Sequence, residues 1–122
     1  MKTLKLKKTR ELTKEIYEIT SQGDISRDLA LKDQLRRAAI SIMANVSEGF
    51  EREGNKEFKQ FLAMGKGSVG EVKAQLSVAS DASLIDSDNF TKIMALADET
   101  ARLLAGFLKY LKASDHKGSK FM

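Results

Sequence analysis

The chain has 122 residues and a formal net charge of +4, and this length suits one domain with a modest core. Apolar residues make up 42% of it, which excludes compositional disorder, and the absence of cysteine excludes a disulfide-stabilised secreted scaffold. No apolar run approaches the roughly 20 residues of a membrane span, and the charged N-terminus does not resemble a signal peptide. We therefore expect a cytoplasmic protein without a membrane partner, and the absence of proline favours helices.

The first predicted helix covers residues 9–20. Leu12, Ile16 and Ile19 recur there at helical spacing, while lysine and glutamate fill the other face. Gly23 follows this pattern and is suited to a left-handed cap. The next helix can be capped by one of three nearby side chains, Asp24, Ser26 or Asp28.

The second predicted helix runs from about Leu29 to Glu48, with Gly49 as its cap. Its apolar stripe consists of Leu31, Leu35, Ala38, Ile42 and Val46. A polar row follows the opposite flank and consists of Arg37, Ser41, Asn45 and Glu48. Such a row is either a solvent-exposed face or a hydrogen-bonded contact with another subunit. In the second interpretation, Ser41, Asn45 and Glu48 lie at an oligomer interface.

The third predicted helix begins near Lys56 and continues to Ala82. Its seam alternates steps of four and three residues, through Phe58, Leu62, Gly65, Val69, Val72, Leu76 and Ala79. The letters from Gly65 to Gly70 match the dinucleotide-binding pattern G-x-G-x-x-G, but no strand precedes them and the seam runs through them. Each glycine inside a helix costs roughly 1 kcal/mol relative to alanine. We therefore predict that these glycines allow close packing between helices.

The fourth predicted helix spans about Asp88 to Lys112 and carries two adjacent apolar seams. The first consists of Phe90, Met94, Ala97, Ala101, Leu104, Leu108 and Leu111. The second includes four candidates for an oligomer interface, Ile93, Leu96, Leu103 and Phe107. One bundle core needs a stripe only a little over 100° wide, so two seams favour contact with another subunit over a wide core-facing helix. Residues 113–122 are polar, and we expect a flexible tail beyond a bundle of residues 1–112.

Four amphipathic helices joined by short turns predict an all-α, antiparallel up-down-up-down four-helix bundle. In that topology the N-terminus, the turn at 49–55 and the end of the fourth helix lie at the same end. Both ends of the chain are rich in lysine, so this end attracts nucleic acid or acidic partners, unless the lysines only keep the protein soluble. The candidate nucleic-acid contacts are Lys2, Lys5, Lys7, Lys8, Arg36, Arg37, Arg52, Lys56, Lys59, Lys109 and Lys112.

The sequence offers no convincing catalytic or metal site. His116 is the only histidine and lies in the predicted tail, so no serine has a histidine base within the fold. The stretch from Gly49 to Lys56 is a near miss to a phosphate-binding loop, but no strand leads into it. The glutamates beside it, Glu48, Glu51, Glu53 and Glu57, suit a solvated capping cluster better than acid–base catalysis. We expect a protein that is not an enzyme and needs no cofactor or metal.

One long run of residues is recognisable. LRRAAISIMANVSEGFER, followed by KEFKQFLAMGKGSVGEVKAQL, resembles the rRNA intervening-sequence family of bacterial four-helix-bundle proteins. The accessory variability determinant of diversity-generating retroelements belongs to the same group. The likeness covers about residues 4–112 and is densest from 35 to 76. Two positions depart from the family pattern, because Met43 replaces a usual proline and Lys7 replaces a tryptophan.

The resemblance implies a four-helix protomer, a barrel-like homopentamer and a role with nucleic acid. It also implies a partner protein, since the retroelement member binds a reverse transcriptase. The leading hypothesis is therefore a non-catalytic homo-oligomer that binds RNA or DNA electrostatically. The alternatives are a scaffold or accessory factor for a reverse transcriptase, and a structural oligomer without a nucleic-acid ligand.

Overall fold

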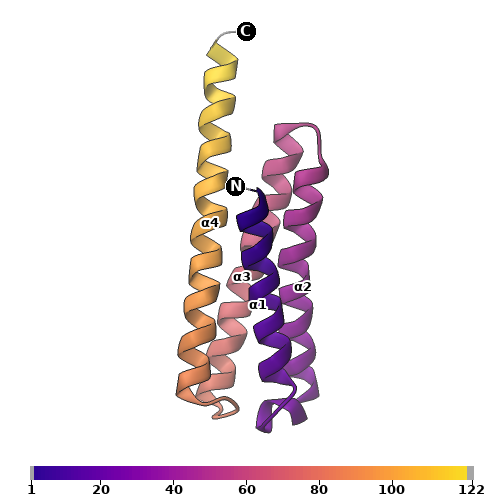
Figure 1. Ribbon diagram of the computed structural model, residues 1–122, viewed down its shortest axis with the longest axis vertical. Coiled ribbons are helices and arrows are strands. Elements are labelled where there is room, and N and C mark those ends of the chain that lie inside the picture. Colours follow the sequence, from indigo (N-terminus) through magenta and orange to yellow (C-terminus); the bar gives the residue numbers. More distant parts are fainter. Residues whose placement is uncertain (1, 121–122) are drawn as a thin grey trace.

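The computed structural model contains four α-helices and one short 3-10 helix, and it describes the backbone of residues 2–120 and the side chains of residues 5–114 (Figure 1). The elements are α1 (Lys2–Thr20), the 3-10 helix η1 (Asp24–Arg27), α2 (Leu29–Glu51), α3 (Asn55–Asp81) and α4 (Ser87–Lys120). Consecutive α-helices run in opposite directions, and no strand occurs in residues 2–120. The predicted all-α four-helix architecture is confirmed.

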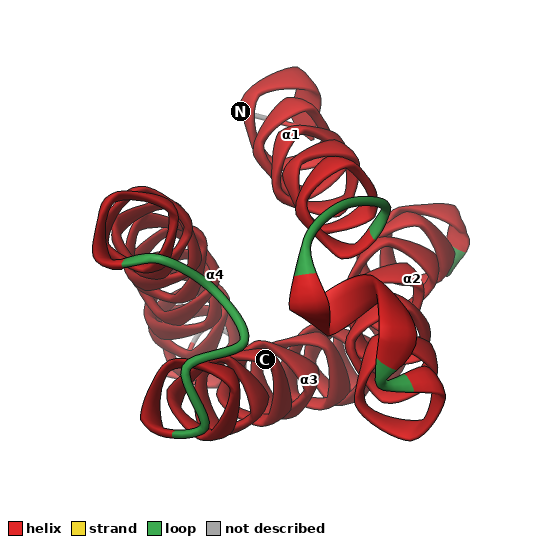
Figure 2. Ribbon diagram, turned by 90° about the horizontal axis from the view of Figure 1, so that it is seen from below, coloured by secondary structure: helices red, strands yellow, loops and turns green. Residues whose placement is uncertain are grey.

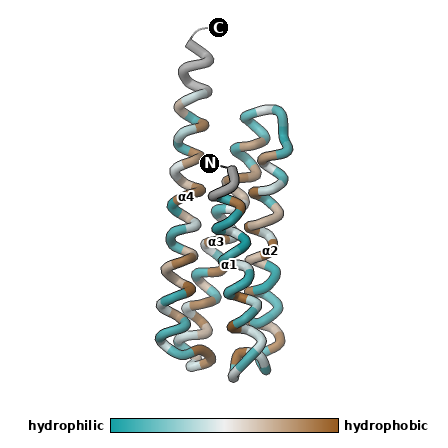
Figure 3. The backbone as a smooth tube through the Cα atoms, in the orientation of Figure 1, coloured by the Kyte–Doolittle hydropathy of each residue, from teal (hydrophilic) through white to brown (hydrophobic). Residues whose placement is uncertain are grey.

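Seen end-on, the helices stand at the corners of a quadrilateral, with α1 diagonal to α3 and α2 diagonal to α4 (Figure 2). The most extensive packing joins α2 to α3, and the packing of α1 on α4 is less extensive. Hydrophobic segments recur along every helix (Figure 3). Because consecutive apolar residues are three or four positions apart, each helix turns one stripe toward the centre.

The core is built from these stripes. Its largest fully buried side chains include Leu12, Ile16, Leu35, Ile42, Leu62, Val69, Val72, Leu76, Ile93 and Leu104. Burying a side chain of this size contributes about 1.5–3 kcal/mol. The predicted seam of α3 is buried from Leu62 to Ala79, and only Phe58 at its start is partly exposed.

Short polar side chains begin two of the helices. The Asp28 carboxylate accepts a hydrogen bond from the Leu31 N–H (3.0 Å) and caps α2. Asp86 accepts one from the Asn89 N–H (2.7 Å) at the start of α4. Two residues in the turns between helices have positive φ, Gly23 (68°) and Ser83 (59°). Gly23 has ψ −164° and directly precedes η1, so it is not the left-handed cap predicted for the first helix. The N–H of Leu84 then reaches back to the Ala79 carbonyl (2.8 Å) and closes the end of α3.

Several predicted helix ends are corrected. The first helix begins at Lys2 rather than residue 9, and α4 continues past Lys112 to Lys120, so most of the predicted tail is helical. The second helix continues through Gly49 to Glu51, so Gly49 is not its cap. Instead, Gly49 is buried, and a Cβ there would lie 3.0 Å from Cδ1 of Phe58. The missing side chain leaves room for that ring.

The glycines of α3 divide into two kinds. A Cβ on Gly65 would lie 3.4 Å from Cγ2 of Val46 and 3.6 Å from the Ile42 carbonyl oxygen, so α3 approaches α2 closely there, as predicted. Gly67 and Gly70 are exposed, and a Cβ on either would meet no described atom within 4 Å. Within the described chain, no close packing offsets the helix-propensity cost of these two glycines. Of the described helices, none is both long and apolar enough to cross a membrane.

Candidate nucleic-acid interface

The start of α1, the turn between α2 and α3, and the end of α4 lie at one end of the bundle, the upper end in Figure 1. This arrangement follows from the antiparallel topology and brings together most of the cations that the sequence singled out. The rotation of each helix about its axis then determines which of these cationic side chains are exposed to solvent. The side chain of Lys2 lies outside the described residues.

Lys5 is not available to a ligand, which corrects its prediction as a nucleic-acid contact. It is 3% exposed, and its Nζ lies 4.3 Å from the centroid of the Phe107 ring. Phe107 packs against Phe58 (5.3 Å between centroids), which packs against Phe50 (5.0 Å). Burial among these groups lowers the pKa of Lys5, because it disfavours the charged form. Lys5 closes the upper end of the core.

Lys8 is partly neutralised by α4. Its Nζ lies 3.1 Å from the Glu99 carboxylate and 3.6 Å from that of Glu11. The hydrogen bond to Glu99 is the main reason that the pKa of Lys8 is raised. Lys59 also has an interaction partner. These lysines therefore offer less free charge than the sequence suggested.

Arg36 ties the end of α1 to α2. Its guanidinium donates hydrogen bonds to Oγ1 of Thr20 (2.8 Å) and Oγ of Ser21 (2.9 Å), and it lies 4.3 Å from the centroid of the Tyr17 ring. It also donates to the Tyr17 carbonyl (3.4 Å) near the end of α1, and the hydroxyls of Thr20 (3.3 Å) and Ser21 (2.7 Å) donate to the same carbonyl. Arg36 is thus a structural residue in the free protein.

The other two predicted arginines form ion pairs. Arg37 contacts Asp33 at 2.8 Å. Arg52 contacts Glu48 at 2.6 Å and Glu57 at 3.7 Å across the turn between α2 and α3. These ion pairs involve Glu48 and Glu57, two of the four glutamates that were predicted to form a solvated capping cluster. They also reduce the positive charge at the turn.

Exposed cations without a hydrogen bond or ion pair in the described side chains remain on three elements. Those predicted from the sequence are Lys7 on α1, Lys56 at the start of α3, and Lys109 and Lys112 on α4. The structure adds Arg10 and Lys14, which share the exposed face of α1 with Lys7 at three- and four-residue steps. We call Lys7, Arg10 and Lys14 the α1 cation row. Their spacing was the signal in the sequence, and only Lys7 was singled out there.

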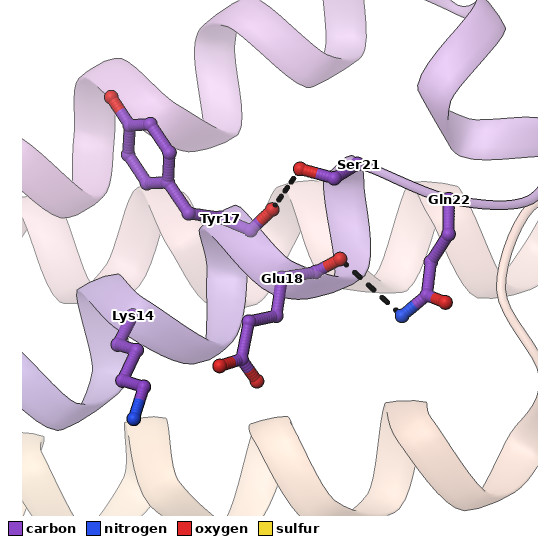
Figure 4. A pocket seen from close by; sticks show the side chains of 5 residues that line it. All are labelled: Lys14, Tyr17, Glu18, Ser21 and Gln22. Atoms are coloured by element: carbon purple, nitrogen blue, oxygen red, sulfur yellow. Dashed lines mark hydrogen bonds between the residues drawn. The ribbon is translucent and has the colours of Figure 1, made fainter.

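A shallow depression lies at the lower end of this face (Figure 4). It is lined by Lys14, Tyr17, Glu18, Ser21 and Gln22. Lys14 and Glu18 extend on one side of α1 and the Tyr17 ring on the other, with its hydroxyl at the outer end. Tyr17 is 37% exposed. The depression therefore combines a cation, a carboxylate and an aromatic ring.

The side chains of the polar row predicted on α2 mostly form contacts within the chain. The hydroxyls of Ser41 and Ser68 are 2.9 Å apart, and Asn45 donates to the Ser41 carbonyl at 2.9 Å. Glu48 contacts Arg52, as described above. The hydrogen bond between Ser41 and Ser68 joins α2 to α3 near Gly65, where the two helices approach closely. The row is therefore a contact between helices of one chain as well as a partly exposed flank.

The second apolar seam of α4 is also largely buried within the chain. Ile93 and Leu96 are buried in the core, which corrects the interpretation that they face another subunit. Leu103 and Phe107 are partly buried. An uncovered face lies on α3, and its exposed small and apolar residues are Ala63, Met64, Gly67, Gly70, Ala74 and Val78. Met64 and Val78 are 55% and 54% exposed.

No group of three or more His, Cys, Asp or Glu residues that could hold a metal ion occurs among the described residues. Three surface features of the described residues bear on binding: the α1 cation row, the Tyr17 ring beside it, and the outer face of α3.

Comparisons with known proteins agree with this architecture. A family model described as 23S rRNA-intervening sequence protein matches residues 2–106. A crystal structure of a protein of unknown function from the S23 ribosomal protein family of Bacteroides thetaiotaomicron superposes with a TM-score of 0.79 and 19% identity. The match covers 86% of this chain and 98% of that one, and at this identity it shows the fold alone. No curated protein matches the chain.

Proposed function

This chain belongs to the 23S rRNA-intervening sequence protein family, and we propose that it is a non-catalytic, homo-oligomeric protein that binds nucleic acid through the exposed cations of α1. Its association with rRNA intervening sequences follows from the family description. The observation that carries the proposal is the α1 cation row, whose three side chains are exposed and form no ion pair in the described part of the chain.

The α1 cation row suits a phosphate backbone because its charge is not cancelled locally. Glu11 and Glu15, the acidic residues next to the row in sequence, contact Lys8 (3.6 Å) and Lys92 (3.2 Å) instead. At the turn between α2 and α3, by contrast, Arg52 is shared between two glutamates. A protein that neutralises phosphates releases counterions, so the affinity depends strongly on salt.

Binding of a fluorescently labelled RNA, measured by anisotropy across a salt series, tests this proposal. Three phosphate contacts predict that affinity falls about 20- to 40-fold between roughly 50 mM and 200 mM salt. Further contacts from Lys56, Lys109 and Lys112 would steepen the dependence. Absence of binding at low salt, or affinity independent of salt, would refute the electrostatic role.

The homo-oligomer is supported by the outer face of α3. Met64 and Val78 expose apolar surface there, and Gly67 and Gly70 between them would let a second helix approach closely. We propose that a second copy packs on this face and, from the resemblance to the family, that the assembly is a pentamer.

Light scattering tests the assembly directly. A pentamer predicts a mass five times the 13.5 kDa of the chain. Gly67→Leu should lower this mass, while Gly106→Leu, at an equally open position on α4, should leave it unchanged. A wild-type monomer would refute the assembly, and an unaffected Gly67→Leu assembly would refute the choice of face.

The same apolar face favours a second candidate function, an accessory factor that holds a partner protein such as a reverse transcriptase. The gene neighbourhood separates the two candidates. A reverse transcriptase gene beside this one favours the accessory factor, and a position within a 23S rRNA gene favours the nucleic-acid-binding oligomer.

A further inference from the structure

Tyr17 continues the face that carries the α1 cation row. Arg10, Lys14 and Tyr17 are separated by four and three residues, so they lie on neighbouring turns of one exposed stripe of α1. Within this stripe the Lys14 side chain extends to one side of the helix and the Tyr17 ring to the other (Figure 4). The distance from Arg10 to Tyr17 along the helix is about 10 Å. A ring and a row of free cations are thus presented to solvent together.

The Tyr17 ring is held in place. The Arg36 guanidinium lies 4.3 Å from its centroid and is itself fixed by hydrogen bonds to Thr20 (2.8 Å) and Ser21 (2.9 Å). Tyr17 is nevertheless 37% exposed, and its hydroxyl has no hydrogen-bond partner among the described residues. An aromatic ring immobilised beside free cations loses little conformational entropy when a flat ligand stacks on it.

We propose that this face of α1 binds single-stranded nucleic acid, with a base stacked against Tyr17 and the backbone phosphates on the α1 cation row. The inference rests on the proposed function and adds the class of ligand. In a duplex the faces of the bases are covered by their neighbours, so only a single strand can place a base on the ring. The Glu18 carboxylate beside Lys14 repels phosphates and directs the backbone toward Arg10 and Lys7.

The first test compares three ligands of equal length: a single strand, the corresponding duplex, and a polyphosphate without bases. The proposal predicts that the single strand binds at least tenfold more tightly than the other two at the same salt concentration, a difference of about 1.4 kcal/mol. Equal binding of all three would overturn the single-strand inference and leave the electrostatic proposal intact. Binding of none would refute the proposed function itself.

The second test detects stacking directly. The chain has two tyrosines and no tryptophan, so Tyr110→Phe leaves Tyr17 as the only tyrosine fluorophore. A single strand should quench its emission after correction for ligand absorbance, and polyphosphate should not. Binding of the single strand without quenching would overturn the stacking geometry.

Substitutions separate the ring from the charge. Tyr17→Leu should weaken single-strand binding about 5- to 150-fold, the equivalent of about 1–3 kcal/mol, with an unchanged salt dependence. Tyr17→Phe, which keeps the ring, should retain wild-type affinity and controls for folding. Lys66→Gln removes an exposed, unpaired cation from α3, diagonal to α1, and should have no effect. Equal losses in Tyr17→Phe and Tyr17→Leu, or none in Tyr17→Leu, would overturn the proposal.

Discussion

Gly49→Ala tests how the upper end of the core is packed. The substitution should gain about 0.8–1.0 kcal/mol from helix propensity, because Gly49 lies inside α2. The new Cβ would however lie 3.0 Å from Cδ1 of Phe58 and 3.2 Å from Cβ of Phe61. Phe58 has little room to retreat, since its ring packs against Phe50 (5.0 Å) and Phe107 (5.3 Å). Overpacking of this kind costs about 1–3 kcal/mol, so we expect a net loss of about 1 kcal/mol.

Gly106→Ala is the matched control. Gly106 also lies inside a helix, but an added Cβ would meet no described atom within 4 Å. The control should therefore gain about 1 kcal/mol, and the two variants should differ by about 2 kcal/mol, or about 5–10 °C in Tm. Thermal and urea unfolding, followed by circular dichroism, measure both. If Gly49→Ala stabilised the protein as much as Gly106→Ala, the rings would be free to move and the reasoning would fail.

Three further predictions follow from single sites. Ser83→Gly should raise the free energy of unfolding by up to about 1 kcal/mol in urea, because Ser83 holds a left-handed φ of 59°; a loss of stability would contradict this. Burial lowers the pKa of Lys5 below 10.5, so the unfolded chain binds more protons between the folded-state pKa and pH 10.5. The stability of the wild type relative to Lys5→Met should therefore rise with pH in that window, and a flat difference would count against the burial. Glu18→Gln should tighten single-strand binding several-fold in anisotropy titrations, and unchanged or weaker binding would show that the backbone does not pass near this carboxylate.

Hydrophobic periodicity predicted the four helices because a helix in this bundle is defined by the stripe it buries. Local side-chain chemistry limited the cap of the second helix to Asp24, Ser26 or Asp28, and Asp28 is the cap. This was possible because a cap needs only residues within one turn. The ends of the helices were harder. Glycine commonly ends a helix, so the sequence predicted Gly49 as a C-cap, but Gly49 lies inside α2 and packs against Phe58. That contact joins two helices and does not show in the local sequence.

The candidate interface shows the same division. Lys5 and Lys7 look alike as letters, but Lys5 is seven residues before Leu12 and lies on the buried side of α1, so extending the stripe would have predicted its burial. The same spacing argument would have found Arg10 and Lys14. The role of Arg36 could not be predicted in this way, because it depends on where the end of α1 meets α2. Likewise, the burial of Ile93 depends on how α4 is rotated against the other helices.

The α1 cation row is the centre of this account, and its removal is the most direct test. Wild type and the triple variant Lys7→Gln, Arg10→Gln and Lys14→Gln should be titrated with the same labelled single strand across a salt series. The account predicts weaker binding by the variant and a slope of log affinity against log salt that is shallower by about 2, since each phosphate contact on a single strand contributes about 0.7. Equal affinities and equal slopes for the two proteins would contradict it.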